Sequence, residues 1–137
     1  MTSSTGDLDW LLDELLSRLP GVHHAVVHST DGLLLGRCGT MSREDAEHFA
    51  AISATLYGLA RSAGNRFDGG AVRQAVIELE RAVLFVTTAG ANACIAVQAV
   101  EEANLGMVAY EMNMTVQRVG HLLATSARTG PSGYGSI

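Results

Sequence analysis

The sequence contains no lysine, and its nine basic residues are arginines that lie scattered along the chain. A chain without lysine has no G-x-x-x-x-G-K-[ST] loop for nucleotide phosphates, and scattered arginines form no stripe that neutralises a nucleic acid or an anionic membrane. The G-x-S-x-G and H-E-x-x-H motifs of hydrolases are missing as well. These absences predict a protein that is not an enzyme, has no catalytic residues, carries no cofactor and does not bind nucleic acid.

Long hydrophobic runs are also missing, since no apolar stretch approaches the roughly 20 residues of a membrane span. The N-terminus carries acidic residues where a secretory signal carries basic ones, so we expect a cytoplasmic protein that does not insert into a membrane. Cysteine is scarce, and the spacing of Cys38 and Cys94 is not that of a C-x-x-C motif. We therefore expect two reduced, partly buried thiols with neither a redox role nor a metal.

The composition that is present describes a globular domain. The chain has 137 residues, of which 47% are hydrophobic and 17% charged, and its net charge is −5. This length suffices for a single domain that buries a core without disulfides or metals. We expect the domain to span residues 7–128, between a flexible segment at 1–6 and a disordered tail at 129–137.

The first patterned segment is an amphipathic helix rich in leucine, which we expect to end at Pro20-Gly21. Acidic residues near its start suit the positive end of the helix dipole. The leucines recur at the i, i+3, i+4, i+7 spacing of a single helix face. They are Leu8, Leu11, Leu12, Leu15, Leu16 and Leu19.

A β-hairpin is expected next, because the β-branched run Val22–Ser29 precedes a Thr-Asp-Gly turn and three leucines. This run contains three histidines, which raises the question of a metal site. Side chains alternate between the two faces of a strand, so His23 and His24 point to opposite sides, and His28 lies about 13 Å from His24. The three imidazoles cannot share one ion, and we predict no zinc site here.

A second helix is expected from a capping box at Ser42 to about Asn65. Amphipathic periodicity predicts that one side of this helix packs against the core of the domain. The residues on that side are Phe49, Ile52, Leu56, Leu59 and Ala63.

The opposite side of the same helix carries small residues, where an exposed face usually carries charges. A glycine in mid-helix costs on the order of 1 kcal/mol relative to alanine, so Gly58 favours a close approach by a second helix. The alternative is that the alanines serve helix propensity and Gly58 is merely tolerated. The line of small residues is Ala50, Ala54, Gly58 and Ser62.

Three further strands are expected at residues 72–79, 83–88 and 93–100. Their short connections require antiparallel neighbours. The first strand alternates polar and apolar residues and suits a sheet edge, whereas the other two are nearly all apolar and suit the centre. A third helix at 104–128 completes the order α-β-β-α-β-β-β-α. Its apolar face consists of Val108, Met112, Val119, Leu122 and Leu123.

Four stretches appear together in this order: a leucine helix ending in LPGV, the hairpin VVHSTDGLLLG, a capped alanine-rich helix, and ANLGMVAYEM before the last helix. With these features the chain, from about Asp7 to Arg128, resembles the roadblock/dynein light-chain family in its bacterial branch of small-GTPase regulators. The resemblance implies an α/β (α+β) fold with a single roadblock-like domain. It also implies a five-stranded antiparallel sheet with the first and third helices on one face and the second on the other.

The resemblance further implies a homodimer, in which the second helices of two copies meet and the edge strands at 72–79 pair. This agrees with the line of small residues and with the alternating edge strand, both of which suggest a close neighbour. The interface residues expected on these grounds are Ala50, Ala54, Gly58, Ser62, Arg73, Ala75 and Ile77.

In function, the resemblance implies a platform for a Ras-like small GTPase, acting as an activator or scaffold in bacterial signal transduction, with a membrane sensor kinase complex nearby. The candidate contacts with the GTPase are Glu47, Arg61 and Asn65, on the exposed surface of the second helix. An arginine finger is a further possibility for Arg61 or Arg66, although a solvated or dimer-contacting role is the favoured interpretation.

A different class of function remains open from the sequence. The sheet and helices can enclose a pocket that senses a small ligand, with His23, His24 or His28 as its polar group. A ligand sensor shows a saturable rise in melting temperature with a metabolite or metal, whereas a platform responds to its protein partner.

Overall fold

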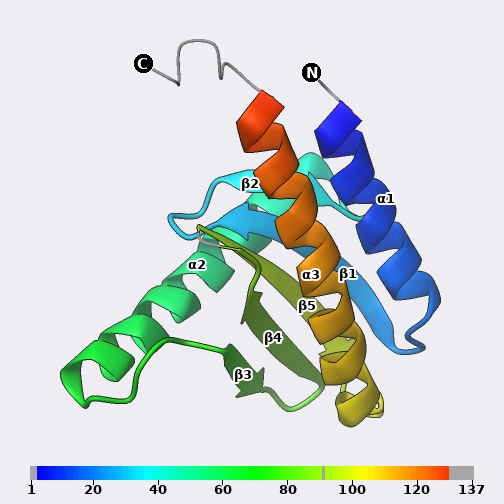
Figure 1. The fold of residues 1–137 in the computed structure, drawn as a ribbon. Coiled ribbons are helices and arrows are strands. Elements are labelled where there is room, and N and C mark those ends of the chain that lie inside the picture. The colour runs from blue at the N-terminus through cyan, green and yellow to red at the C-terminus, as the bar shows by residue number, and fades with distance from the viewer. Residues whose placement is uncertain (1–2, 91, 130–137) are drawn as a thin grey trace.

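The structure, a computed structural model, describes residues 3–90 and 92–129 (Figure 1). Within these residues it contains the eight elements in the expected order, which confirms the α+β fold class. The tail expected to be disordered lies almost wholly outside the described residues. The elements are α1 (Ser3–Ser17), β1 (Val22–Ser29), β2 (Leu34–Arg37), α2 (Arg43–Arg66), β3 (Gln74–Glu78), β4 (Ala82–Thr88), β5 (Ala93–Val100) and α3 (Leu105–Thr129).

The five strands form one antiparallel sheet in the order β2-β1-β5-β4-β3. The prediction that the alternating strand lies at an edge and the two apolar strands lie inside is confirmed. α1 and α3 contact each other across one face of the sheet, and α2 packs on the other face (Figure 1). The sheet is therefore a shared wall between two different surfaces of the molecule.

α1 buries the predicted leucine face. Leu12 and Leu15 are fully buried, and Leu16 packs against the core from a partly exposed position. The helix begins at Ser3, four residues before the expected start of the domain, so residues 3–6 are helical. It ends at Ser17, and the chain then turns through Gly21, whose φ of +91° is unfavourable for a residue with a side chain.

The β1–β2 hairpin turns as its sequence predicts. The Ser29 hydroxyl donates to Asp31 Oδ1 at 2.6 Å and accepts from the backbone N–H of Leu33 at 2.9 Å. The hydrogen bond from Ser29 lowers the pKa of the Asp31 carboxyl. Gly32 supplies the positive φ, +97°, that closes the turn.

α2 begins at the predicted cap, but its packing differs from the prediction. Its N-cap residue Ser42 accepts a hydrogen bond from the backbone N–H of Asp45 at 3.1 Å. The predicted core face is wrong for Ile52 and Leu59, which are 53% and 65% exposed, and for Ala63, which is exposed as well. No residue of the helix after Ser53 is buried, although Leu56 and Tyr57 still pack against the core from partly buried positions. The buried residues of α2 are Ala46, Phe49, Ala50 and Ser53.

Candidate functional site

The second half of α2 and the neighbouring strand β3 carry large apolar side chains that the chain leaves uncovered. Phe67, at the C-cap of α2, is the most exposed of them at 78%. Soluble monomers rarely leave large contiguous apolar patches in water, so such a surface indicates an interaction site. α2 and β3 contact each other, so these exposed side chains lie on neighbouring elements. We call it the α2–β3 surface, and it consists of Ile52, Leu59, Phe67, Val76 and Leu79.

β3 adds an open sheet edge to this surface. It pairs with β4 on one side, and in the described part of the chain its other side has no strand. Ala75 and Ile77 point to one face and are partly buried, whereas Val76 points to the other face and is 44% exposed. Arg73 is exposed just before the strand. An unpaired edge beside an apolar patch offers backbone groups to another strand.

The line of small residues on α2 divides into two halves. Ala50 is fully buried within the chain, and Ala54 lies under the hairpin turn, 3.5 Å from the position of a Cβ added at Gly32. Ala50 therefore offers no surface to a partner. A Cβ added at Gly58 meets nothing within 4 Å, and Ser62 is exposed. The open part of the line is the second half of α2, beside the α2–β3 surface.

The three candidate GTPase contacts are exposed but do not form one cluster. Glu47 forms an ion pair with Arg43 at 3.3 Å, near the start of α2. Arg61 lies over the ring of Tyr57, with its guanidinium carbon 5.5 Å from the ring centre. Asn65 lies one helical turn beyond Arg61, whereas Glu47 lies about 21 Å from Arg61 along the helix. The structure thus groups Arg61 with Asn65.

Polar groups lie buried beneath α2. Nδ1 of His28 lies 2.7 Å from the Ser29 carbonyl oxygen, to which it donates, and Nε2 has no partner among the described residues. Burial lowers the pKa of His28. Cys94 lies opposite His28 on β5, and burial raises the pKa of its thiol to about 11, so the sulfur stays protonated at neutral pH. The Ser53 hydroxyl is also buried without a partner in the described structure.

These groups do not assemble into a metal site. Among the residues that the structure describes, no three His, Cys, Asp or Glu side chains come close enough to hold an ion. The histidines of β1 have different surroundings, since His23 is exposed and His28 is fully buried.

Comparison with known proteins identifies the family. A model of the Roadblock/LC7 domain matches residues 8–99. The chain belongs to the Roadblock/LC7 family. The predicted resemblance is therefore confirmed. Among curated proteins no match is found. In the described part of this Roadblock/LC7 chain, no helix is both long enough and apolar enough to cross a membrane.

Solved structures support the assignment. The crystal structure of a Roadblock/LC7 domain from Streptomyces avermitilis is 46% identical, with a TM-score of 0.82, covering 85% of this chain and 98% of that one. The gliding protein MglB from Thermus thermophilus is 18% identical, with a TM-score of 0.77 and coverages of 88% and 90%. A structure described as MglB with tetrameric arrangement is also 18% identical, with a TM-score of 0.78 and the same coverages. At this identity the MglB structures show a shared fold.

The sequence reasoning missed Ile52 and Leu59 as surface residues, although one signal was available. A helix of 24 residues is about 36 Å long. Strands of eight residues span only about 26 Å. α2 is therefore longer than the strands it packs on, and an apolar residue beyond its buried part, such as Leu59, needs another partner.

Proposed function

We propose that this Roadblock/LC7 protein is a non-enzymatic homodimeric platform that binds and regulates a Ras-like small GTPase in a bacterial signalling system, as an activator or scaffold. The observation that carries the proposal is the α2–β3 surface, where exposed apolar side chains lie beside an unpaired strand edge. Family membership and the description of one MglB structure as a tetrameric arrangement support self-association. A cytoplasmic location and a sensor kinase complex upstream belong to the same proposal.

In the proposed dimer the β3 strands of two copies pair antiparallel, and the second halves of the two α2 helices pack against each other. A two-fold axis at Val76 sets Glu78 opposite Gln74 of the partner subunit, so the two Glu78 carboxylates avoid each other. Gly58 and Ser62 allow the helix backbones to approach closely, and the exposed Leu59 becomes buried. Ala54, Arg73, Ala75 and Ile77 complete this interface.

The proposed GTPase contact is the exposed side of α2 around Arg61 and Asn65, with Glu47 farther along the helix. Arg61 is held over Tyr57, which orients its guanidinium group before any partner binds. We favour a role for this arginine in positioning the GTPase rather than in the reaction, so that activation works through the partner's own switch residues.

Light scattering tests the self-association and the partner together. The free protein is expected at about 29 kDa, twice the 14.4 kDa chain. A Ras-like GTPase is then added in its GDP form or bound to a non-hydrolysable GTP analogue, and a gain in mass confined to the GTP-like form supports an activator or effector role. A monomer at micromolar concentration, or a dimer that binds neither form, would contradict the proposal.

Substitutions at Gly58 test dimerisation separately from folding. Gly58→Leu fills space that is open in the single chain, so the variant is expected to fold as a monomer. Gly58→Ala is the matched control, because it raises helix propensity by about 1 kcal/mol with little added volume and keeps the dimer. If Gly58→Leu keeps the dimer mass, the small residues serve helix propensity only.

A further inference from the structure

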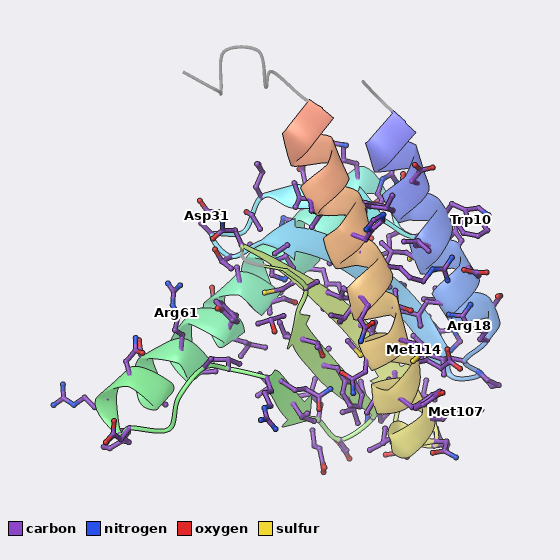
Figure 2. All side chains as sticks on the ribbon, viewed as in Figure 1. Trp10, Arg18, Asp31, Arg61, Met107 and Met114 are labelled. Carbon is purple, nitrogen blue, oxygen red and sulfur yellow. The ribbon has the colours of Figure 1, made fainter. Side chains whose placement is uncertain are left out.

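A second exposed apolar surface lies on the other side of the molecule, along the outer faces of α1 and α3. Trp10 is 57% exposed on α1, and three residues of α3 expose similar fractions: Met107 46%, Tyr110 61% and Met114 51%. Figure 2 shows Trp10 on α1 and both methionines on α3, with Arg18 close by. Tryptophan, tyrosine, methionine and arginine are the residues enriched in protein interfaces. We call this surface the α1–α3 groove, defined by Trp10, Met107, Tyr110 and Met114.

The surface is hollowed in two adjoining places. A hollow of about 400 Å³ lies between Trp10 and His121, and one of about 370 Å³ lies between Tyr110 and Met114. Arg118 and the neighbouring Gln117 line both hollows, so the two are continuous along α3. From Tyr110 to His121 the two hollows follow 11 residues of α3, a length of about 17 Å. That length matches about three turns of a docked helix.

The groove is held in shape before anything binds. Arg18 Nε donates to Glu111 Oε1 at 2.9 Å, and Arg118 Nη1 donates to Glu14 Oε1 at 2.8 Å, so two ion pairs join α1 to α3. The hydrogen bond from Arg118 lowers the pKa of the Glu14 carboxyl. Arg118 also lies over the Trp10 ring, 5.7 Å from its centre. A rigid aromatic anchor loses little entropy on binding.

Charge selects the occupant. The acidic groups inside the groove are paired with arginines, whereas Asp7 lines the first hollow and Glu101 and Glu102 are exposed in the turn before α3. The two ends of the groove are therefore acidic. Two copies of this surface would bring like charges together, which disfavours self-association here. A partner with basic residues flanking an apolar stripe complements the groove.

We propose that the α1–α3 groove binds an amphipathic helix of another protein, with apolar side chains along one stripe and lysines or arginines beside it. The apolar stripe packs on Trp10, Tyr110 and the two methionines, whose flexible side chains adapt to its shape. The groove lies across the sheet from α2, so the proposal stands apart from the GTPase platform.

Trp10 provides the readout, because it is the chain's one tryptophan. The full-length protein is titrated with a leucine/lysine amphipathic helical peptide of about 16 residues without aromatics, and with its leucine/glutamate counterpart. We expect a saturable blue shift of Trp10 emission with the lysine peptide alone, and light scattering that shows no change in oligomeric state. No saturable shift, or equal binding of the glutamate peptide, overturns the proposal.

Matched variants separate the groove from general attraction to an acidic protein. Met114→Gln replaces an apolar side chain with a polar one of similar length and keeps the helix propensity and the charge of the protein. We expect the lysine peptide to bind this variant at least fivefold more weakly. Leu33→Gln changes a residue in the hairpin turn that is more exposed than Met114, at 67% against 51%, and leaves binding unchanged. Equal effects of the two substitutions overturn the proposal.

The emission of the free protein tests the other occupants. A water-exposed Trp10 emits at long wavelength, as the proposal requires. If the free chain already emits as a buried tryptophan, a second copy or residues 130–137 fill the groove, and the proposed partner helix is wrong.

Discussion

α1 and α2 carry the same kind of apolar periodicity, but they differ in how far their apolar side chains are buried. α1 buries Leu12 and Leu15 completely against α3 and the sheet, whereas α2 leaves Leu59 65% exposed and buries no side chain after Ser53. The ion pairs differ in the same way. Arg18–Glu111 and Arg118–Glu14 join two helices, whereas Arg43–Glu47 lies within one exposed helix face. An apolar stripe shows that a helix needs a packing partner. It does not show whether the same chain supplies that partner.

The largest expected effect is a loss of stability on the α1 side of the sheet, where the leucines are buried within the chain. Leu12→Ala leaves a cavity between α1 and the sheet, because Leu12 is fully buried. Buried leucine-to-alanine changes cost about 3–5 kcal/mol. Urea unfolding should show this loss of stability with no change in oligomeric state at native conditions. A loss below about 1 kcal/mol would mean that the α1 side is packed as loosely as α2.

The same substitution on the other side should act on assembly. Leu59→Ala removes a side chain that is mostly in water within the single chain, so the chain itself loses less than about 0.5 kcal/mol. The proposed dimer should weaken on the order of tenfold or more, measured by sedimentation over a concentration series. Leu33→Ala, equally exposed in the hairpin turn, is the control and keeps the dimer. An unchanged dimer constant for Leu59→Ala places the contact elsewhere.

His28 ties stability on the α2 side to pH. Burial lowers the pKa of His28 from its ordinary value of 6.5. Just below pH 6.5 this imidazole is therefore protonated in the unfolded chain but still neutral in the folded chain. The free energy of unfolding should therefore fall as pH drops from about 7 towards the folded pKa, by at most about 1.4 kcal/mol per pH unit. Unfolding curves at fixed protein concentration measure this slope.

His28→Gln should flatten the slope between about pH 7 and 5, where His28 is the group with a lowered pKa. His48→Gln, at an exposed site on α2, should keep it. Glu14 and Asp31 also have lowered pKa values, and their contribution is lost at more acidic pH, below their ordinary values of 4.5 and 3.8. A slope that survives in His28→Gln would assign it to another group.

The smallest expected effect concerns the ion pairs. Glu111→Gln removes the partner of Arg18, which is one-third exposed, and should lower stability by about 0.5–1 kcal/mol. Glu47→Gln removes the exposed partner of Arg43 and should change stability by less than about 0.5 kcal/mol. The two losses of stability are compared by thermal unfolding in low and high salt. Equal losses for Glu111→Gln and Glu47→Gln would contradict the expected electrostatic difference between the α1 side and the α2 side.

Much of the fold followed from local patterns. The leucine spacing of α1, the Ser42 cap and the alternation along β3 each predicted an element that the structure contains. These signals are local because helix and strand periodicity depend on neighbouring residues in the chain. The candidate site was predicted less well, since Ala50 proved buried and Ile52 and Leu59 proved exposed.

By itself, the sequence determined the elements, their order, the edge position of β3 and the family, because these depend on residue spacing along the chain. Only the tertiary structure decided which side chains stay uncovered. Full burial along α2 ends at Ser53, so the same apolar stripe is core near Phe49 and surface near Leu59. Likewise, Trp10 and Met114 are distant in sequence and lie on one surface only because α1 packs against α3.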